Sequence, residues 1–339
     1  MRVLVTGGTG FLGSHSVKAL RDAGHEVRLL VRRPDRIAPA LEPLGVDGVD
    51  HAVGDITDAD SVARALDGCD AVVHAASAIF LDRRRAAEML DVNPRGTANV
   101  LRSAHEWGLD PIVHVSSNAA LMPLHGRVLA PGVPLGNPPG AYSQSKVASE
   151  RVARELQDEG APVVIVNPVG LLGPHDPHLG DFMTIARDVL LGKMPLAVAG
   201  AMSVVDVRDV AAVHAALMEP GRGPRRYVVA AGHMTLKDLA AVGSRLTGRR
   251  IRTFTLPDSV ALGAGRVFDV VARTLHVPTP FSYEGAWFLM HREAFDASAV
   301  ELDLGVSMRP VEETLEDAFR WLVEAGHVNG RRAGRLAAA

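Results

Sequence analysis

The stretch VTGGTGFLGS at residues 5–14 decides the fold, because it places glycines at regular intervals between a β-branched run and a helical pattern. Counted from Gly7 the glycines recur every third residue, and counted from Gly8 the stretch reads GxGxxG, with Gly10 and Gly13 in both patterns. Such a turn lets the backbone approach a pyrophosphate, whose charge then meets free N–H groups of the following helix. The strand–turn–helix context therefore predicts a dinucleotide site rather than a merely flexible turn.

The composition indicates a globular protein that acts on a small molecule. The 339 residues are 47% hydrophobic, which suffices for a sizeable core and, by length, for about two domains. The formal net charge of −3 favours neither nucleic acid nor an anionic membrane as the main partner. A single cysteine, Cys69, excludes an intrachain disulfide, and the chain starts directly with a strand pattern instead of an export signal. We therefore expect a cytoplasmic protein.

Alternating patterns over the first 170 residues predict an α/β fold of the Rossmann type, with a doubly wound parallel sheet. The β-branched runs indicate the strands, and the longer periodic patterns indicate the helices. Strands are expected at 2–7, 26–32, 50–55, 71–76, 112–117 and 162–168, and helices at 12–23, 58–67, 86–107 and 141–159.

After Pro168 the regularity ends, and a smaller C-terminal α/β substrate cap is expected. We assign residues 1–170 plus 203–218 to the nucleotide-binding domain, 171–202 plus 219–329 to the cap, and 330–339 to a flexible tail. No apolar stretch is long enough for stable membrane insertion. The amphipathic 259–275 is expected to be a core or lid helix, with contact to a lipid surface as the alternative. Within the cap, strands are expected near 226–231 and 251–256, and helices near 235–247, 259–275 and 311–325.

The end of the second predicted strand indicates which dinucleotide binds. An acidic residue there would bind a ribose 2′-hydroxyl and select NAD(H), whereas this chain has Arg32 and Arg33. A guanidinium group matches the geometry of a 2′-phosphate, so NADP(H) is the expected cofactor, with NAD(H) as the alternative.

Tyr142 and Lys146 carry the predicted chemistry, because a spacing of four residues puts both side chains on one face of a helix. A free phenol titrates near pH 10, but a neighbouring ammonium group stabilises the phenolate and makes Tyr142 a usable general acid and base. Ser116 and Ser117, at the carboxyl end of a predicted strand, offer a hydroxyl that can hold a substrate oxygen.

Taken together, the motifs TGGTGFLG, GDITD, VVHAAS, NPRGTANVL, VSS and YSQSK resemble those of extended short-chain dehydrogenases/reductases, the NAD-dependent epimerase/dehydratase superfamily. The resemblance implies that Tyr142 transfers the proton, that Lys146 binds the nicotinamide ribose and lowers the pKa of Tyr142, and that Ser117 holds the substrate oxygen. It places Asn93 in a helix that supports the site. The cofactor residues it implies are Gly7, Gly10, Phe11, Leu12, Gly13, Arg32, Asp55, Ile56, Ala75, Ala76, Tyr142, Lys146 and Pro168.

Departures from other branches narrow the reaction. The sugar dehydratases carry an acidic pair after the catalytic hydroxyl, where this chain has Asn118 and Ala119, and nucleotide-sugar epimerases carry an arginine where it has Met202. The sequence is more similar to the dihydroflavonol-reductase-like branch, which implies reduction of a ketone or aldehyde, or the reverse oxidation. The candidate substrate contacts are Asn118, Ile79, Phe80 and Met183, with Leu81, Phe182 and Met194 as further apolar candidates.

Two other functions are alternatives to this oxidoreductase. One is a sugar epimerase that retains its cofactor, and the other is a non-catalytic protein that senses NADP(H). The HDPH stretch at 175–178 with Asp181 has metal-ligand residue types, but its loop position and Pro177 argue against a metal site. Many members of the family dimerise through a four-helix contact, for which the helices at 86–107 and 141–159 are the candidates here, with a monomer as the alternative.

Overall fold

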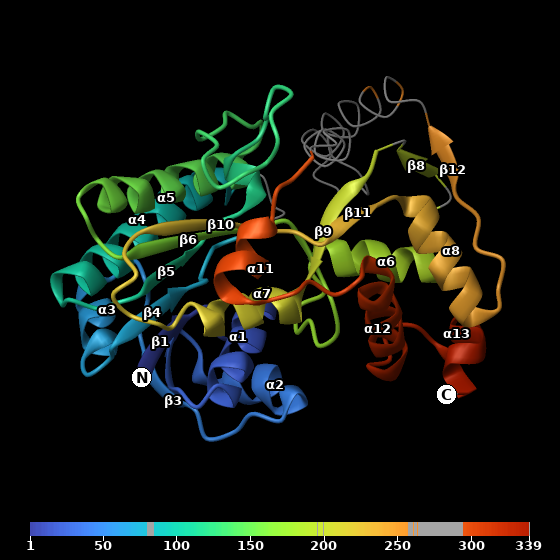
Figure 1. The fold of residues 1–339 in the computed structure, drawn as a ribbon. Coiled ribbons are helices and arrows are strands. Elements are labelled where there is room, and N and C mark those ends of the chain that lie inside the picture. Colours follow the sequence, from blue (N-terminus) through green and yellow to red (C-terminus); the bar gives the residue numbers. More distant parts are fainter. Residues whose placement is uncertain are drawn as a thin grey trace.

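The computed structural model describes residues 1–79, 85–194, 196–198, 200–256 and 294–338, together with Val260 and Gly263. In this part of the chain, seven parallel strands form one sheet in the order β10-β6-β5-β4-β1-β2-β3, as expected for a Rossmann-type fold (Figure 1). The strands are β1 (Arg2–Thr6), β2 (Glu26–Val31), β3 (Asp50–Val53), β4 (Ala71–His74), β5 (Ile112–Val115), β6 (Val163–Pro168) and β10 (Arg225–Val229).

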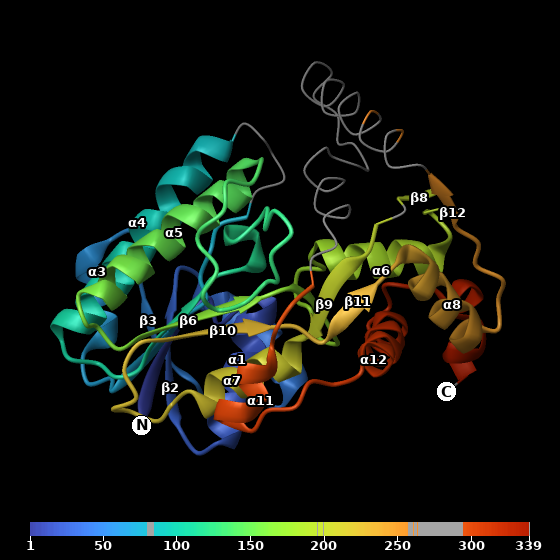
Figure 2. The ribbon, with the colours of Figure 1, turned by 45° about the horizontal axis from the view of Figure 1, so that its top comes forward.

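Helices cover both faces of this sheet, which explains why its central strands read as nearly continuous apolar runs. In β1, Val3 and Val5 pack in one core cluster whereas Leu4 packs in another on the opposite face. The first face carries α1 (Phe11–Asp22), α2 (Ile37–Leu41) and α7 (Val207–Ala216), and the second carries α3 (Ala59–Leu66), α4 (Ala86–Glu106) and α5 (Ala141–Asp158). The helices α4 and α5 lie side by side (Figure 2). That these two helices form a homodimer contact stays a prediction.

The cap contains smaller sheets and a second group of helices. Met183, Leu239 and Phe319 are among the buried residues of its core. Its three-stranded sheet has the order β11-β9-β7. The strands are β7 (Gly170–Leu172), β8 (Leu196–Val198), β9 (Met202–Asp206), β11 (Gly232–Met234) and β12 (Phe254–Leu256), and the helices are α6 (Asp181–Leu191), α8 (Leu236–Thr247), α12 (Val311–Glu324) and α13 (Gly330–Ala333).

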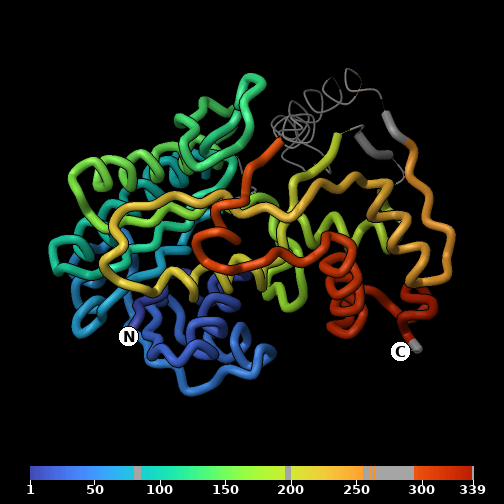
Figure 3. Tube along the Cα trace, in the orientation of Figure 1, coloured from blue at the N-terminus to red at the C-terminus, as the bar shows by residue number. Residues whose placement is uncertain are grey.

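The strand near 226–231 was expected in the cap but lies in the main sheet instead. As β10 it pairs in parallel with β6, with Tyr227 opposite Val166, and Tyr227 is buried. The helix α11 (Ser298–Leu304) also packs on the nucleotide-binding side, against β10 and α7. The chain therefore passes between the two halves repeatedly, as the tube in Figure 3 shows.

The end of the chain is likewise different from the expected flexible tail. Residues 330–338 form α13 and the 3₁₀ helix η5 (Gly334–Ala338), and the Asn329 side chain caps α13 by accepting a hydrogen bond from the Arg332 N–H group. Ala333 is buried in the cap core, which gives this segment a reason to fold back.

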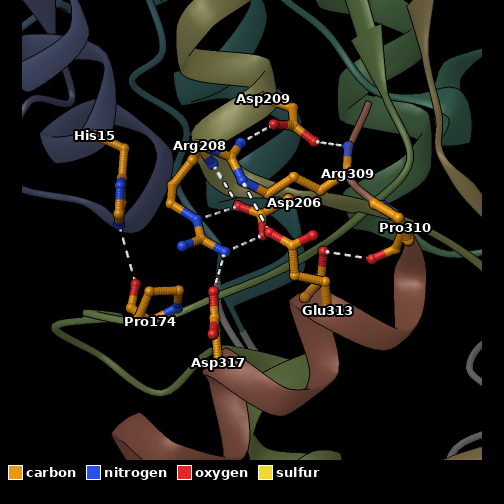
Figure 4. A network of polar contacts seen from close by, with 10 residues as sticks. His15, Pro174, Asp206, Arg208, Asp209, Arg309, Pro310, Glu313 and Asp317 are labelled. Atoms are coloured by element: carbon orange, nitrogen blue, oxygen red, sulfur yellow. Dashed lines mark hydrogen bonds and ion pairs between the residues drawn. The ribbon is translucent and has the colours of Figure 1, made fainter. Parts of the chain in front are cut away.

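A polar network joins the two halves (Figure 4). Asp206 caps α7 and pairs with Arg208, which also binds Asp317 of α12 at 2.7 Å. Burial alone would raise the pKa of Asp206, but the hydrogen bonds and charge of Arg208 outweigh burial and hold it below its usual value. Nearby, Asp209 accepts hydrogen bonds from the backbone and guanidinium groups of Arg309. These contacts fix α7 against the chain that leads into α12.

In the described part of the chain, no helix is both long and apolar enough to cross a membrane. The predicted helix at 259–275 lies outside the described residues apart from Val260 and Gly263.

Candidate active site

The glycine-rich turn has the shape that a dinucleotide pyrophosphate requires. Gly7 has φ of 75°, and a Cβ atom there would lie 2.7 Å from the Ala76 nitrogen. A Cβ atom on Gly13 would collide with the backbone of Gly7, so neither position can carry a larger residue without movement. The following helix α1 begins after Gly10 without a capping side chain, leaving its first N–H groups for an anion.

The two arginines after β2 have different surroundings. Arg33 pairs with Asp35 at 2.8 Å. The Arg32 side chain is 78% exposed and its guanidinium lies 3.9 Å from the Asp55 carboxylate. Of the two, Arg32 is thus the more exposed side chain and the one with the longer ion-pair distance.

The remaining predicted cofactor residues lie at or after the carboxyl ends of neighbouring strands and at the start of α1. Ala75 and Ala76 directly follow β4, where the Ala76 N–H group donates to Thr6. Ile56 packs tightly against Gly96 of α4, where an added Cβ atom would collide with the Ile56 side chain. Pro168 is buried at the end of β6. Phe11 and Leu12 form the start of α1.

Lys146 lies beneath the site as a buried cation. It is 7% exposed, and its Nζ atom donates to the Val115 carbonyl oxygen at 3.4 Å, at the end of β5. Burial lowers the pKa of Lys146 to about 8, although the negative charge of Glu150 opposes this shift. Tyr142 lies one turn earlier on the same helix, half-buried. The structure thus brings the ammonium group to the end of the strand that leads to Ser117.

The two serines have different environments. Ser116 is 3% exposed and donates to the Glu150 carboxylate at 2.6 Å, which occupies its hydroxyl. Ser117 is half-buried at the start of the 3₁₀ helix η4 (Asn118–Ala120). Its Oγ atom accepts a hydrogen bond from the Ala119 N–H group at 3.2 Å and donates a long one, 3.4 Å, to Asn118 Oδ1, which a substrate oxygen could replace. This geometry favours Ser117 as the hydroxyl that holds a substrate.

Asn93 contacts α5, the helix of Tyr142 and Lys146, through its side-chain amide. Its Nδ2 atom donates to Ser145 at 2.9 Å, and Ser145 donates to the Tyr142 carbonyl oxygen at 2.7 Å. The same amide binds both backbone groups of Ala78. Asn93 therefore links α5 to the chain after β4.

Sequence reasoning missed a buried carboxylate that organises the site. Glu150 is fully buried on α5 and accepts hydrogen bonds from Ser116, Arg154 and Asn167. Asn167 also donates to the Ser117 carbonyl oxygen at 3.2 Å. The available signal was the spacing YxxxKxxxE, which places Glu150 on the same helix face as Lys146.

Two buried histidines lie under the lysine, and neither was singled out from the sequence. His74 and His114 stack with ring centroids 5.7 Å apart, and Thr6 and Thr97 bind the two nitrogens of His74. Burial, followed by the charge of Lys146, lowers the pKa of His74 to about 3. Both rings therefore stay neutral beneath the cation.

The predicted substrate residues do not share one environment. Asn118 opens η4 beside Ser117, and Ile79 is 59% exposed. Met183 is 1% exposed within the cap core, so its position is that of a packing residue rather than of a pocket wall. Phe80 and Leu81 lie outside the described residues. Met202, at the position considered for a diphosphate-binding arginine, is also in the cap core.

Among the described residues, no group of three or more His, Cys, Asp or Glu side chains is arranged to hold a metal ion. In the HDPH stretch, Asp176 instead accepts hydrogen bonds from the backbone of His178 and Gly180.

Comparisons with known sequences extend along nearly the whole chain. Residues 3–230 match the NAD dependent epimerase/dehydratase family. A protein of Synechocystis sp. provisionally named dihydroflavonol 4-reductase is 31% identical over 96% of this chain and 95% of its own length. Sterol demethylase protein B of Methylococcus capsulatus is 30% identical over 97% of this chain and 100% of its own length.

Comparisons with solved structures agree with the fold. The crystal structure of gox2253 has a TM-score of 0.82 and 29% identity, covering 96% of this chain and 99% of its own. MoeE5, solved in complex with UDP-glucose and NAD, has a TM-score of 0.74 at 21% identity, which supports the fold alone. The chain belongs to the NAD-dependent epimerase/dehydratase family and is an NAD(P)-dependent oxidoreductase of the extended short-chain dehydrogenase/reductase class.

Proposed function

We propose that the protein interconverts a ketone or aldehyde and its alcohol on a small, fairly apolar substrate, with NADP(H) as cofactor. The observation that carries this proposal is the buried Lys146 ammonium, which lies one helical turn from Tyr142 and contacts the end of the strand leading to Ser117.

Each side chain has a defined part in the reaction. Ser117 donates a hydrogen bond to the carbonyl oxygen of the substrate and orients it. Tyr142 donates its phenolic proton to that oxygen during reduction and takes it back during oxidation. Lys146 stabilises the phenolate that remains, because a cation in a desolvated setting interacts strongly with a neighbouring anion. The bound nicotinamide supplies or accepts the hydride.

Arg32 supports the choice of NADP(H). Its exposed guanidinium can form charge-assisted hydrogen bonds with a 2′-phosphate, whereas Arg33 is already paired with Asp35. Asp55 holds the adjoining turn by accepting hydrogen bonds from Thr57. We place Asp55 and Ile56 beside the adenine.

A substrate without a diphosphate is supported by the position of Met202. Its apolar side chain lies in the cap core and cannot neutralise a phosphate. Asn118 and Ile79 remain the substrate contacts that we propose, because both lie near the ends of strands that carry the site.

The test is Tyr142→Phe, assayed with NADPH over a panel of ketones and aldehydes. We expect NADPH binding to persist and reduction to fall about a hundredfold or more, since proton transfer contributes on that order. Reduction that persists at more than a few per cent of wild type would show that Tyr142 is not the proton donor.

The same assay separates the alternatives. A sugar epimerase would be purified with tightly bound oxidised cofactor and would show no net NADPH consumption. A sensing protein would bind NADPH without turnover on any member of the panel.

A further inference from the structure

A pocket of about 400 Å³ lies at the far end of the cap, lined by Arg249, Asn329, Arg331 and Arg332. It is built by segments that are distant in the sequence: α13 packs on α6, and η5 packs on α8. Figure 1 shows α8 and α13 together near the C-terminus. Three guanidinium groups are therefore brought to one hollow by the fold.

Arg249 is held in place by backbone oxygens rather than by a carboxylate. Its Nη1 atom donates to the Leu190 carbonyl at 3.1 Å and to the Arg332 carbonyl at 2.6 Å. This arrangement fixes one edge of the guanidinium and leaves its positive charge without a formal counter-charge. Capping the last turn of α6 explains Arg249 alone, but it gives no role to the other arginines of the pocket.

Among the described residues, the pocket arginines have no acidic partner. Arg331 and Arg332 are exposed, and neither forms an ion pair with any residue that the structure describes. The Arg335 side chain packs on Gly248, next to Arg249: a Cβ atom added to Gly248 would lie 2.8 Å from the Arg335 Nε atom. Arg335 also forms no ion pair with a described residue. Like charges gathered in this way repel one another.

Other arginines of the same region are neutralised. Arg245, on α8, binds Glu312 at 2.5 Å and Glu316 at 2.9 Å, and Arg320 also approaches Glu316. The chain as a whole has a net charge of −3, so an excess of positive charge in one hollow is a local feature of the fold. A bound anion would reduce the electrostatic repulsion among the pocket arginines.

We propose that this pocket binds a compact, soluble polyanion that carries at least two phosphate groups. Arginine forks bind phosphate oxygens in a bidentate manner, so adjoining guanidinium groups match a pair of phosphates better than a single carboxylate. A hollow of about 400 Å³ has room for a small polyanion. The amide of Asn329 adds a hydrogen-bond donor.

The pocket is separate from the glycine-rich turn. The loop before α6 contacts α1, where His15 binds the Pro174 carbonyl at 3.0 Å. The pocket lies at the opposite end of α6, beyond an 11-residue helix that is about 16 Å long. It is thus a second site, apart from the dinucleotide site, and does not depend on the proposed substrate.

The experiment is calorimetric titration of the full chain with inorganic pyrophosphate and tripolyphosphate at constant ionic strength and without NADPH, which carries three phosphate groups of its own and would compete at the pocket. Binding at the glycine-rich turn is the part that the test variant leaves unchanged. The test variant is R331S/R332S, which removes two exposed side chains without an ion pair. The matched control is R245S/R320S, which removes the same charge from nearby helices where both arginines pair with Glu316.

We expect the wild type to bind pyrophosphate, with an affinity that falls as salt is raised. In R331S/R332S the affinity should fall about tenfold or more, because two charge-assisted contacts are lost, and in R245S/R320S by less than about twofold. Equal unfolding temperatures of the ligand-free proteins would show that the test variant folds normally.

Three results would overturn the proposal. The first is the absence of pyrophosphate or tripolyphosphate binding at millimolar concentrations. The second is an equal loss in both double variants, which would indicate only the general field of the protein. The third is binding to phosphatidylglycerol vesicles through Arg331 and Arg332 without competition by pyrophosphate, which would identify a membrane surface instead.

Discussion

The Glu150 carboxylate and the Asn167 amide lie 2.6 Å apart, and this hydrogen bond joins α5 to the end of β6. Asn167 also donates to the Ser117 backbone carbonyl, so the charge that acts on Lys146 and the segment that carries Ser117 belong to one hydrogen-bonded network. The network gives Glu150 both an electrostatic effect and a positioning effect.

The electrostatic effect of Glu150 can be measured in the pH dependence of carbonyl reduction. Glu150 raises the pKa of Lys146 against the larger lowering by burial. In Glu150→Gln the pKa of Lys146 should fall further below about 8, and the ammonium should be lost at lower pH. We expect the alkaline limb of kcat/KM to move down by about half a pH unit or more.

Two neighbouring variants separate this effect from simple disruption. Arg154→Gln removes the partner of Glu150 but keeps its charge, so the alkaline limb should not move down. Asn167→Ala loses the contact with the Ser117 carbonyl and should lower kcat without moving the limb. A downward shift of the same size in all three variants would contradict the electrostatic role.

Cofactor selectivity should depend on Arg32 and not on Arg33. For Arg32→Ser we expect the ratio of kcat/KM with NADPH to that with NADH to fall about tenfold or more, the value of one charge-assisted hydrogen bond. Arg33→Ser is the matched control, because Arg33 already pairs with Asp35. A larger effect in the control would move the 2′-phosphate contact to Arg33.

Acid should destabilise the protein through its buried neutral histidines. Burial lowers the pKa of His214 from 6.5 to about 4, so protons bind the unfolded chain first as the pH falls. The contribution of His214 to the free energy of unfolding should be complete above pH 6.5. It should decrease by about 3 kcal/mol as the pH falls from 6.5 to 4.

Denaturant unfolding at a series of pH values checks this prediction. His214→Leu should flatten the dependence in that window, whereas His51→Leu, at an exposed position, should leave it unchanged. An equally steep pH dependence in His214→Leu would rule out this residue as a source of the acid sensitivity.

The contact between α7 and α12 should contribute strongly to stability. Arg208→Met leaves Asp206 fully buried without its ion-pair partner, which should lower the free energy of unfolding by about 3 kcal/mol or more. Arg222→Met, which breaks the more exposed pair with Glu219, should cost under about 1 kcal/mol. Chemical unfolding of both variants provides the comparison, and similar losses would argue against the network in Figure 4 as a special contact.

The sequence predicted the local elements well because their signals are local. Residues 141–159 were expected to be a helix and Ala141–Asp158 form one, and the six strands of the first 170 residues lie where their β-branched runs are. The spacing of Tyr142 and Lys146 likewise needs only one helix to be understood.

Features that depend on pairing between distant segments were not predicted. The assignment of β10 to the main sheet follows from its register with β6, which its own apolar pattern does not encode. The bond between Glu150 and Asn167 joins a helix to a strand, and the fold of 330–338 depends on the burial of Ala333 by other elements.

The placement of β10 and α11 has a consequence for protein engineering. Because the chain enters and leaves the nucleotide-binding half several times, the cap is not a contiguous block of sequence that can be exchanged between relatives. A graft meant to change the substrate would have to replace separate segments and preserve each crossing. A truncation before Arg225 would remove the edge strand of the main sheet and expose β6 as a new unpaired edge.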